Sequence, residues 1–186
     1  QINSDIKKSA TKRSPLNIAV ALDRSGSMSG QPLEEAKRCI EMIIDSLTND
    51  DHFSLVTYDD VVDIPIPSTS VSNKEWMKSI VRTIQSGGLT ALYDGWSTAA
   101  AEVAKRVSKK SISRVLLLSD GQANAGITDE GTIASHCAEM ASVGVSTTTY
   151  GLGEGFNEEL MTSMAKSGKG LAHYGQTADD LADPFQ

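Results

Sequence analysis

The feature that most constrains the fold is a short apolar run, residues 17–22, which stops at Asp23 and leads through a polar loop into a helical pattern. The run is rich in residues that suit a buried strand. The loop carries three hydroxyl side chains, Ser25, Ser27 and Ser29, between glycines. In an open parallel sheet, ligands bind at loops that leave the carboxyl ends of strands. Because carboxylate and hydroxyl oxygens suit a Mg²⁺-like cation, this stretch is a candidate cation site.

Hydrophobic periodicity predicts strands and helices that alternate along the rest of the chain. Glycine, proline and Asp/Asn clusters separate these segments. The predicted helices are 32–47, 72–84, 91–107, 128–143 and 157–165, with a closing helical turn from 178; the further predicted strands are 52–58, 61–66, 114–118, 145–150 and 171–174. Alternation of this kind is typical of a doubly wound α/β fold, in which helices cover both faces of a parallel sheet.

One strand pair departs from the parallel rule. Residues 52–58 and 61–66 are joined by a tight turn at Asp59 and Asp60, so the second strand is expected to run antiparallel to the first. Two prolines in and after the second strand would interrupt a central ladder, which places this strand at a sheet edge.

Two expectations concern buried side chains. The helix 72–84 is expected to be capped by Ser72 or Asn73 and to bury one apolar face. The members of that face are Trp76, Ile80, Val81 and Ile84. The two cysteines of the chain, Cys39 and Cys137, fall in helical patterns, where free buried thiols are the favoured outcome.

The pattern Asp-x-Ser-x-Ser at Asp23, Ser25 and Ser27 resembles the metal-ion-dependent adhesion site (MIDAS) of von Willebrand factor type A (VWA) domains. Two further segments match in the same order: the Gly-Gly-Leu-Thr sequence that ends at Thr90, and the apolar strand that leads into Ser-Asp-Gly around Asp120. The resemblance extends over roughly residues 15 to 180 and rests on three separate pieces.

This resemblance implies a six-stranded, mostly parallel sheet with one antiparallel edge strand. It assigns Ser25, Ser27 and Thr90 as direct hydroxyl ligands of a divalent cation, with Asp23 and Asp120 holding metal-bound waters. Mg²⁺ is the expected cation, with Mn²⁺ or Ca²⁺ as alternatives. A carboxylate from an Asp or Glu of a partner protein would complete the coordination shell. The implied function is a protein-binding module without catalytic activity.

Two alternatives stay open. Residues 26–30 match G-x-S-x-G, the nucleophile elbow of α/β-hydrolases, with Ser29 as the nucleophile. A hydrolase would also need a histidine later in the chain; His136 lies in a helical pattern, and only His173 could reach the loop end. The second alternative is a structural scaffold whose hydroxyls stabilise the loops without using a metal.

Composition narrows the class of partner. The chain of 186 residues fits one domain, predicted over 15–186 after a linker or arm at 1–14. A net charge of −7 argues against nucleic acid as a partner, and no apolar run approaches the ~20 residues that span a membrane.

Because the chain begins with Gln, we expect it to belong to a larger polypeptide. The lack of a disulfide framework weakly favours an intracellular or microbial protein.

Overall fold

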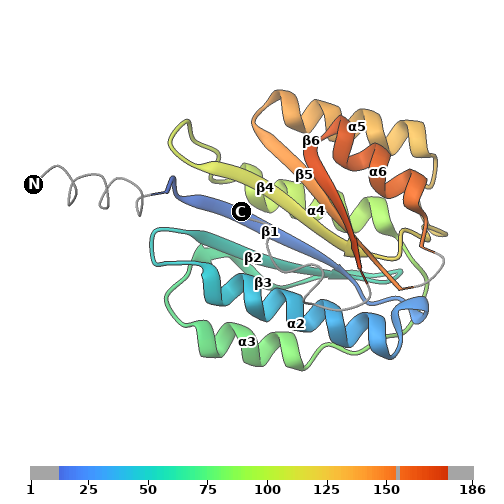
Figure 1. Ribbon diagram of the computed structural model, residues 1–186, viewed down its shortest axis with the longest axis horizontal. Helices are drawn as coiled ribbons and strands as arrows, with labels where there is room; N and C mark the ends of the chain where they lie inside the picture. Colours follow the sequence, from blue (N-terminus) through green and yellow to red (C-terminus); the bar gives the residue numbers. More distant parts are fainter. Residues whose placement is uncertain (1–12, 154–155, 176–186) are drawn as a thin grey trace, which may run out of the picture.

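The computed structural model describes residues 13–153 and 156–175, and this part of the chain forms one sheet with helices on both faces (Figure 1). Its strands are β1 (Leu16–Asp23), β2 (His52–Tyr58), β3 (Val62–Ser70), β4 (Ile112–Ser119), β5 (Val145–Leu152) and β6 (Lys169–Gly175). Its helices are α2 (Gln31–Ser46), α3 (Lys74–Arg82), α4 (Leu92–Ala104), α5 (Glu130–Ser142) and α6 (Glu158–Ser167), with a 3₁₀ turn η1 (Gly26–Met28).

Within the described residues the sheet is six-stranded, in the order β3-β2-β1-β4-β5-β6. Every neighbouring pair is parallel except β2 and β3, which are antiparallel. The predicted doubly wound fold with one antiparallel edge strand is therefore confirmed. β3 extends to Ser70, past Pro65 and Pro67, where the prediction ended at 66. An edge strand tolerates these prolines because one of its sides has no neighbour that needs an N–H donor.

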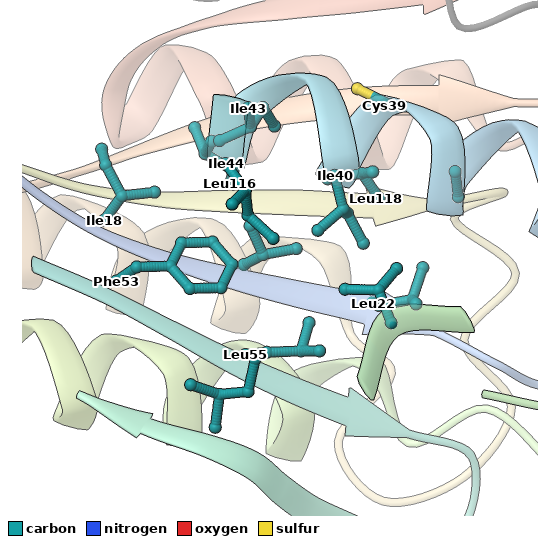
Figure 2. Packing of buried hydrophobic residues seen from close by; sticks show 14 of the residues in the cluster. Ile18, Leu22, Cys39, Ile40, Ile43, Ile44, Phe53, Leu55, Leu116 and Leu118 are labelled. Atoms are coloured by element: carbon teal, nitrogen blue, oxygen red, sulfur yellow. The ribbon is translucent and has the colours of Figure 1, made fainter. Parts of the chain in front are cut away.

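The two faces of the sheet are covered by different helices. Alternate residues of β1 point to opposite faces, so Ile18, Val20 and Leu22 join one apolar cluster and Ala19 and Ala21 join the other. The first cluster lies under α2 and α3, and the second under α4, α5 and α6 (Figure 1). Figure 2 shows the first cluster, in which side chains of α2 pack over those of β1, β2 and β4.

The predicted apolar face of α3 is wrong in one position. Trp76 is 46% exposed, whereas Met77 and Val81 are buried. Asn73 caps the helix by accepting a hydrogen bond from the Trp76 N–H, as predicted. Val81 and Ile84 are buried and Ile80 is partly buried, as predicted, and Met77 packs inward in place of Trp76.

Both cysteines are free and buried, as expected. Burial raises the pKa of the Cys39 and Cys137 thiols to about 12, so both stay protonated and unreactive at neutral pH. The predicted closing turn from 178 and most of the predicted arm at 1–14 lie outside the described residues. Arg13 and Ser14, at the end of that arm, are described.

Asp51 ties the start of β1 to the loop before β2. Its carboxylate accepts hydrogen bonds from both terminal nitrogens of Arg13 at 2.8 and 2.6 Å, and from the Leu16 and Thr48 N–H groups at 2.8 and 2.7 Å. Burial alone would raise the pKa of Asp51, but these hydrogen bonds outweigh it and lower the pKa to about 2.

We therefore expect Asp51→Asn to lower the free energy of unfolding by about 2–3 kcal/mol at neutral pH, since the amide nitrogen that replaces one carboxylate oxygen cannot accept the hydrogen bonds made to that oxygen and the charge that pairs with Arg13 is lost. Because the folded-state pKa is depressed, the stabilisation is present above about pH 4 and disappears as the pH falls toward 2. Urea unfolding at pH 7 and at pH 2.5 measures both effects. The control is Asp50→Asn at the exposed neighbouring position, and an equal loss in that variant would contradict the assignment.

Candidate metal centre

Asp23 lies at the carboxyl end of β1 with all its side-chain oxygens engaged. Its Oδ1 accepts hydrogen bonds from the Ser25 N–H at 2.9 Å and the Ser25 hydroxyl at 2.5 Å. Its Oδ2 accepts from the hydroxyl of Ser119, at the end of neighbouring β4, at 2.7 Å. The Asp23 side chain is fully buried. These contacts fix the carboxylate in one orientation and join the ends of two adjacent strands.

The first loop, residues 24–30, turns immediately into η1. The hydroxyl oxygens of Ser25 and Ser27 lie 3.2 Å apart, so these two side chains face the same side of the loop. Met28 is fully buried and anchors the turn to the core beneath it. The loop therefore presents two adjacent hydroxyls above the buried carboxylate of Asp23.

The second loop, residues 86–91, is held against the first by backbone hydrogen bonds. The Gly26 N–H donates to the Gly88 carbonyl at 3.0 Å, and the Gly87 N–H donates to the Arg24 carbonyl at 2.9 Å. Gly88 has φ +83°, and a Cβ there would lie 2.4 Å from Oδ1 of Asp60. Glycine adopts this positive φ without strain, which allows the path of the chain toward Thr90.

The third loop, residues 120–129, closes on Thr90. The Thr90 N–H donates to Oδ1 of Asn124 at 2.7 Å, and the Asn124 and Ala125 N–H groups donate to the Thr90 carbonyl at 3.1 and 3.2 Å. Thr90 is 2% exposed. Sequence reasoning missed Asn124, although an amide in a loop directly after a strand end was a usable signal.

Asp120 begins this third loop, next to Ser119. Its Oδ1 accepts a hydrogen bond from the Gln122 N–H at 3.0 Å, and its main-chain carbonyl accepts one from the Asn157 N–H, just before α6, at 2.8 Å. The Gly121 N–H donates to the Ser119 hydroxyl at 2.8 Å. The structure thus brings together the three loops that carry Asp23, Ser25, Ser27, Thr90 and Asp120, which we call the three-loop cluster.

The electrostatics of the cluster favour a bound cation. Burial raises the pKa of Asp23 to about 6, against hydrogen bonds from Ser119 and Ser25 that lower it, and the negative charge of Asp120 raises it further. Tyr58 is fully buried at the end of β2, and burial together with the charge of Asp23 raises its pKa well above the usual value. A positive ion at the cluster would reduce the repulsion between the negative charges of Asp23 and Asp120.

The donor set also indicates which ions fit. The three-loop cluster offers hydroxyl and carboxylate oxygens, and the described residues contain no group of three or more His, Cys, Asp or Glu side chains that could hold a metal. A site with two carboxylates and several neutral oxygens suits a hard cation that keeps some of its waters, such as Mg²⁺. The residues present therefore fit a hard divalent ion better than a thiolate- or imidazole-bound one.

The geometry of Ser29 bears on the hydrolase alternative. Ser29 is exposed and follows η1, with its N–H donating to the Gly26 carbonyl at 3.1 Å. His136 bonds to the Tyr93 hydroxyl through Nδ1, and His173 stacks on Tyr150. In the described part of the chain, no hydrogen bond joins Ser29 to a histidine, so the base that an elbow serine needs is not in place.

Comparison with known proteins identifies the family. The sequence profile of the von Willebrand factor type A domain matches residues 17–186. The chain belongs to this family. A relative of this VWA domain, the uncharacterized protein sll0103 of Synechocystis sp., is 30% identical over 179 residues, which make up 94% of this chain and 41% of that protein. The chain therefore spans less than half the length of this relative.

Solved structures agree with the VWA fold. A von Willebrand factor type A protein from Catenulispora acidiphila superposes with a TM-score of 0.76 at 19% identity, covering 92% of this chain and 41% of that one. Proximal thread matrix protein 1 from the mussel byssus was solved with a zinc-occupied MIDAS motif. It superposes with a TM-score of 0.72 at 19% identity, and the match covers 91% of this chain and 46% of that one. Among the described residues, no helix has the length and apolar character needed to cross a membrane.

Proposed function

We propose that this VWA domain is a divalent-cation-dependent protein-binding module without catalytic activity, and that the three-loop cluster is its MIDAS. In this proposal Ser25, Ser27 and Thr90 ligate the ion directly, while Asp23 and Asp120 hold metal-bound waters. The observation that carries the proposal is the joining of three loops, far apart in the sequence, by the hydrogen bonds of Gly26, Gly87 and Asn124.

The ion would supply an electrophilic open coordination position. Few direct carboxylate ligands leave most of its charge uncompensated, so an Asp or Glu of a partner protein would bind it strongly. Mg²⁺ is the proposed ion, with Mn²⁺ or Ca²⁺ as alternatives; the zinc-occupied MIDAS of the mussel protein supports divalent binding in this fold. The domain would act within a larger polypeptide, which the partial coverage of its relative supports.

A selection from displayed random peptides tests this function. Peptides are bound to the immobilised domain in Mg²⁺ and eluted with EDTA. We expect the eluted pool to be enriched in Asp or Glu at one fixed position. Binding that survives EDTA would support the scaffold alternative, and an eluted pool without acidic enrichment would contradict carboxylate recognition. Covalent labelling of Ser29 by a phosphonate would support a hydrolase.

Thr90→Ala tests whether the Thr90 hydroxyl is a direct ligand of the ion, and it leaves the loop intact. The contacts that join Thr90 to Asn124 use its main-chain N–H and carbonyl, which alanine keeps. We expect at least a tenfold loss in Mg²⁺ affinity by isothermal titration calorimetry, with an unchanged circular-dichroism spectrum. The control is Thr98→Ala, which removes an exposed hydroxyl that bonds the Asp94 carbonyl on α4. Equal Mg²⁺ affinity in the two variants would remove Thr90 from the ligand set.

A further inference from the structure

A pocket lies at the opposite end of the sheet from the three-loop cluster. It has a volume of about 470 Å³ and opens at the amino ends of β1 and β2 and the loop before β4. The lining residues that could contact a ligand are Pro15, Arg106, Val107, Ser108, Lys110 and Ser111. β1 begins at this pocket and ends at Asp23. Its eight residues span roughly 25 Å, which is the separation between the pocket and the three-loop cluster.

The pocket is basic on a chain whose net charge is −7. Three cations line it, and Asp50 is the one carboxylate among its lining residues. The Nζ of Lys105 lies 2.6 Å from Oε1 of Glu102, and this ion pair neutralises its charge. Arg106 donates to the hydroxyl and carbonyl oxygens of Ser68, which are uncharged, and no acidic side chain of the described residues forms an ion pair with Lys110. Arg106 and Lys110 therefore form no ion pair among the described residues, although the charge of Glu102 acts on Arg106 and Asp50 lines the same pocket.

Neutral donors and an apolar wall accompany these charges. The hydroxyl oxygens of Ser108 and Ser111 lie 3.1 Å apart, and the Lys110 N–H donates to the Ser108 oxygen at 3.2 Å. Because one of these hydroxyls donates to the other, one hydroxyl hydrogen remains for another acceptor. On the other side, Pro15 and the 39% exposed Val107 offer apolar surface. The lining thus combines oxyanion donors with space for an organic group.

The amino-terminal arm is a poor occupant for this pocket. Its sequence before Arg13 carries Lys7, Lys8 and Lys12 against Asp5, so it has the same charge sign as the pocket. A complementary ligand must be anionic. The two cations that form no ion pair match the charge of about −2 on a phosphate monoester better than the single charge of a carboxylate, and the three terminal phosphate oxygens can accept from both cations and from one serine hydroxyl.

We propose that this pocket binds a small organic phosphate monoester. The phosphate oxygens accept hydrogen bonds from Lys110, Arg106 and one serine hydroxyl, and the organic group packs against Pro15 and Val107. The site is independent of the three-loop cluster and does not rest on the proposed cation-dependent function. It gives the domain a second ligand at the end of the sheet where the chain enters the fold.

Titration of the ¹⁵N-labelled full chain with phenyl phosphate, without divalent cations, tests the site by NMR. We expect saturable shifts centred on the amide signals of Ser108, Lys110 and Ser111. Affinity should fall at least tenfold in Lys110→Glu and change less than twofold in Lys109→Glu. The second variant is the matched control, because it reverses the same charge one residue away at a position outside the pocket.

Two further probes define the ligand class. Inorganic phosphate should bind at least threefold more weakly than phenyl phosphate because it lacks the apolar group, and benzyl alcohol should give no saturable shifts. The proposal is overturned by non-saturable shifts with phenyl phosphate, by an equal loss in the two lysine variants, or by shifts centred on the three-loop cluster. Equal binding of the two phosphates would remove the organic group from the assignment.

Discussion

Replacing Gly95 by alanine should lower the free energy of unfolding by about 3 kcal/mol or more, the upper end of the range for overpacked cores. Gly95 lies in the first turns of α4, where the helix crosses the end of β2. A Cβ at this position would lie 2.2 Å from Cδ1 of the Tyr58 ring. Tyr58 is fully buried and interacts with the charge of Asp23, so a movement of its ring would also disturb Asp23 in the three-loop cluster.

Urea unfolding followed by circular dichroism measures this loss. The matched control is Gly131→Ala in the first turn of α5, where the nearest atom to an added Cβ is Oδ2 of Asp129 at 3.5 Å. Alanine should stabilise that exposed helical position by about 0.5–1 kcal/mol. The two substitutions are thus expected to change stability in opposite directions. A Gly95→Ala variant as stable as the wild-type protein would show that α4 does not pack this closely on β2.

Asp120→Ala should abolish the rise in Tm that Mg²⁺ produces in the wild-type domain. An ion that binds only the folded state at 100 times its Kd adds about 2.7 kcal/mol of stability. For a domain of this size that corresponds to a Tm increase of roughly 5–10 °C. Removing the Asp120 carboxylate removes one of the two charges that favour the ion, so the Tm of the variant should not depend on Mg²⁺.

The readout is the difference in Tm with and without Mg²⁺, because Asp120→Ala also loses the hydrogen bond from the Gln122 N–H and can lower the baseline. Asp120→Asn keeps an oxygen acceptor for that bond while removing the charge, and it should show the same insensitivity. The control is Asp63→Ala, which deletes an exposed carboxylate of the same charge on β3. A full Mg²⁺-dependent rise in either Asp120 variant would exclude this residue from the site.

Much of the fold follows from local patterns in the sequence. The apolar run before Asp23 and the alternating strands and helices predict the doubly wound sheet, and the tight turn at Asp59 and Asp60 predicts its antiparallel edge. These features depend on neighbouring residues, for which periodicity and turn chemistry are informative. The exposure of Trp76 was not predicted because contacts of α3 with α2 and β3 decide which of the neighbouring residues Trp76 and Met77 packs inward.

The candidate site was predictable only in part, because some of its contacts join residues that are far apart in the sequence. Asp23, Ser25 and Ser27 lie in one loop, so their proximity could be read from spacing. The places of Thr90 and Asp120 relative to them depend on strand order, and they were expected through family resemblance alone. The contacts of Ser119 with Asp23 and of Asn124 with Thr90 join residues 96 and 34 positions apart, which no local pattern encodes.

The central claim is that oxygens from three distant loops hold one divalent cation, and Mn²⁺ titration of the ¹⁵N-labelled chain tests it most directly. Mn²⁺ is paramagnetic and broadens amide signals near the bound ion. The account predicts that substoichiometric Mn²⁺ first broadens the signals of residues 24–28, 88–91 and 120–124, and that excess Mg²⁺ restores them. Broadening centred on other acidic surface residues, or none at all, would contradict it.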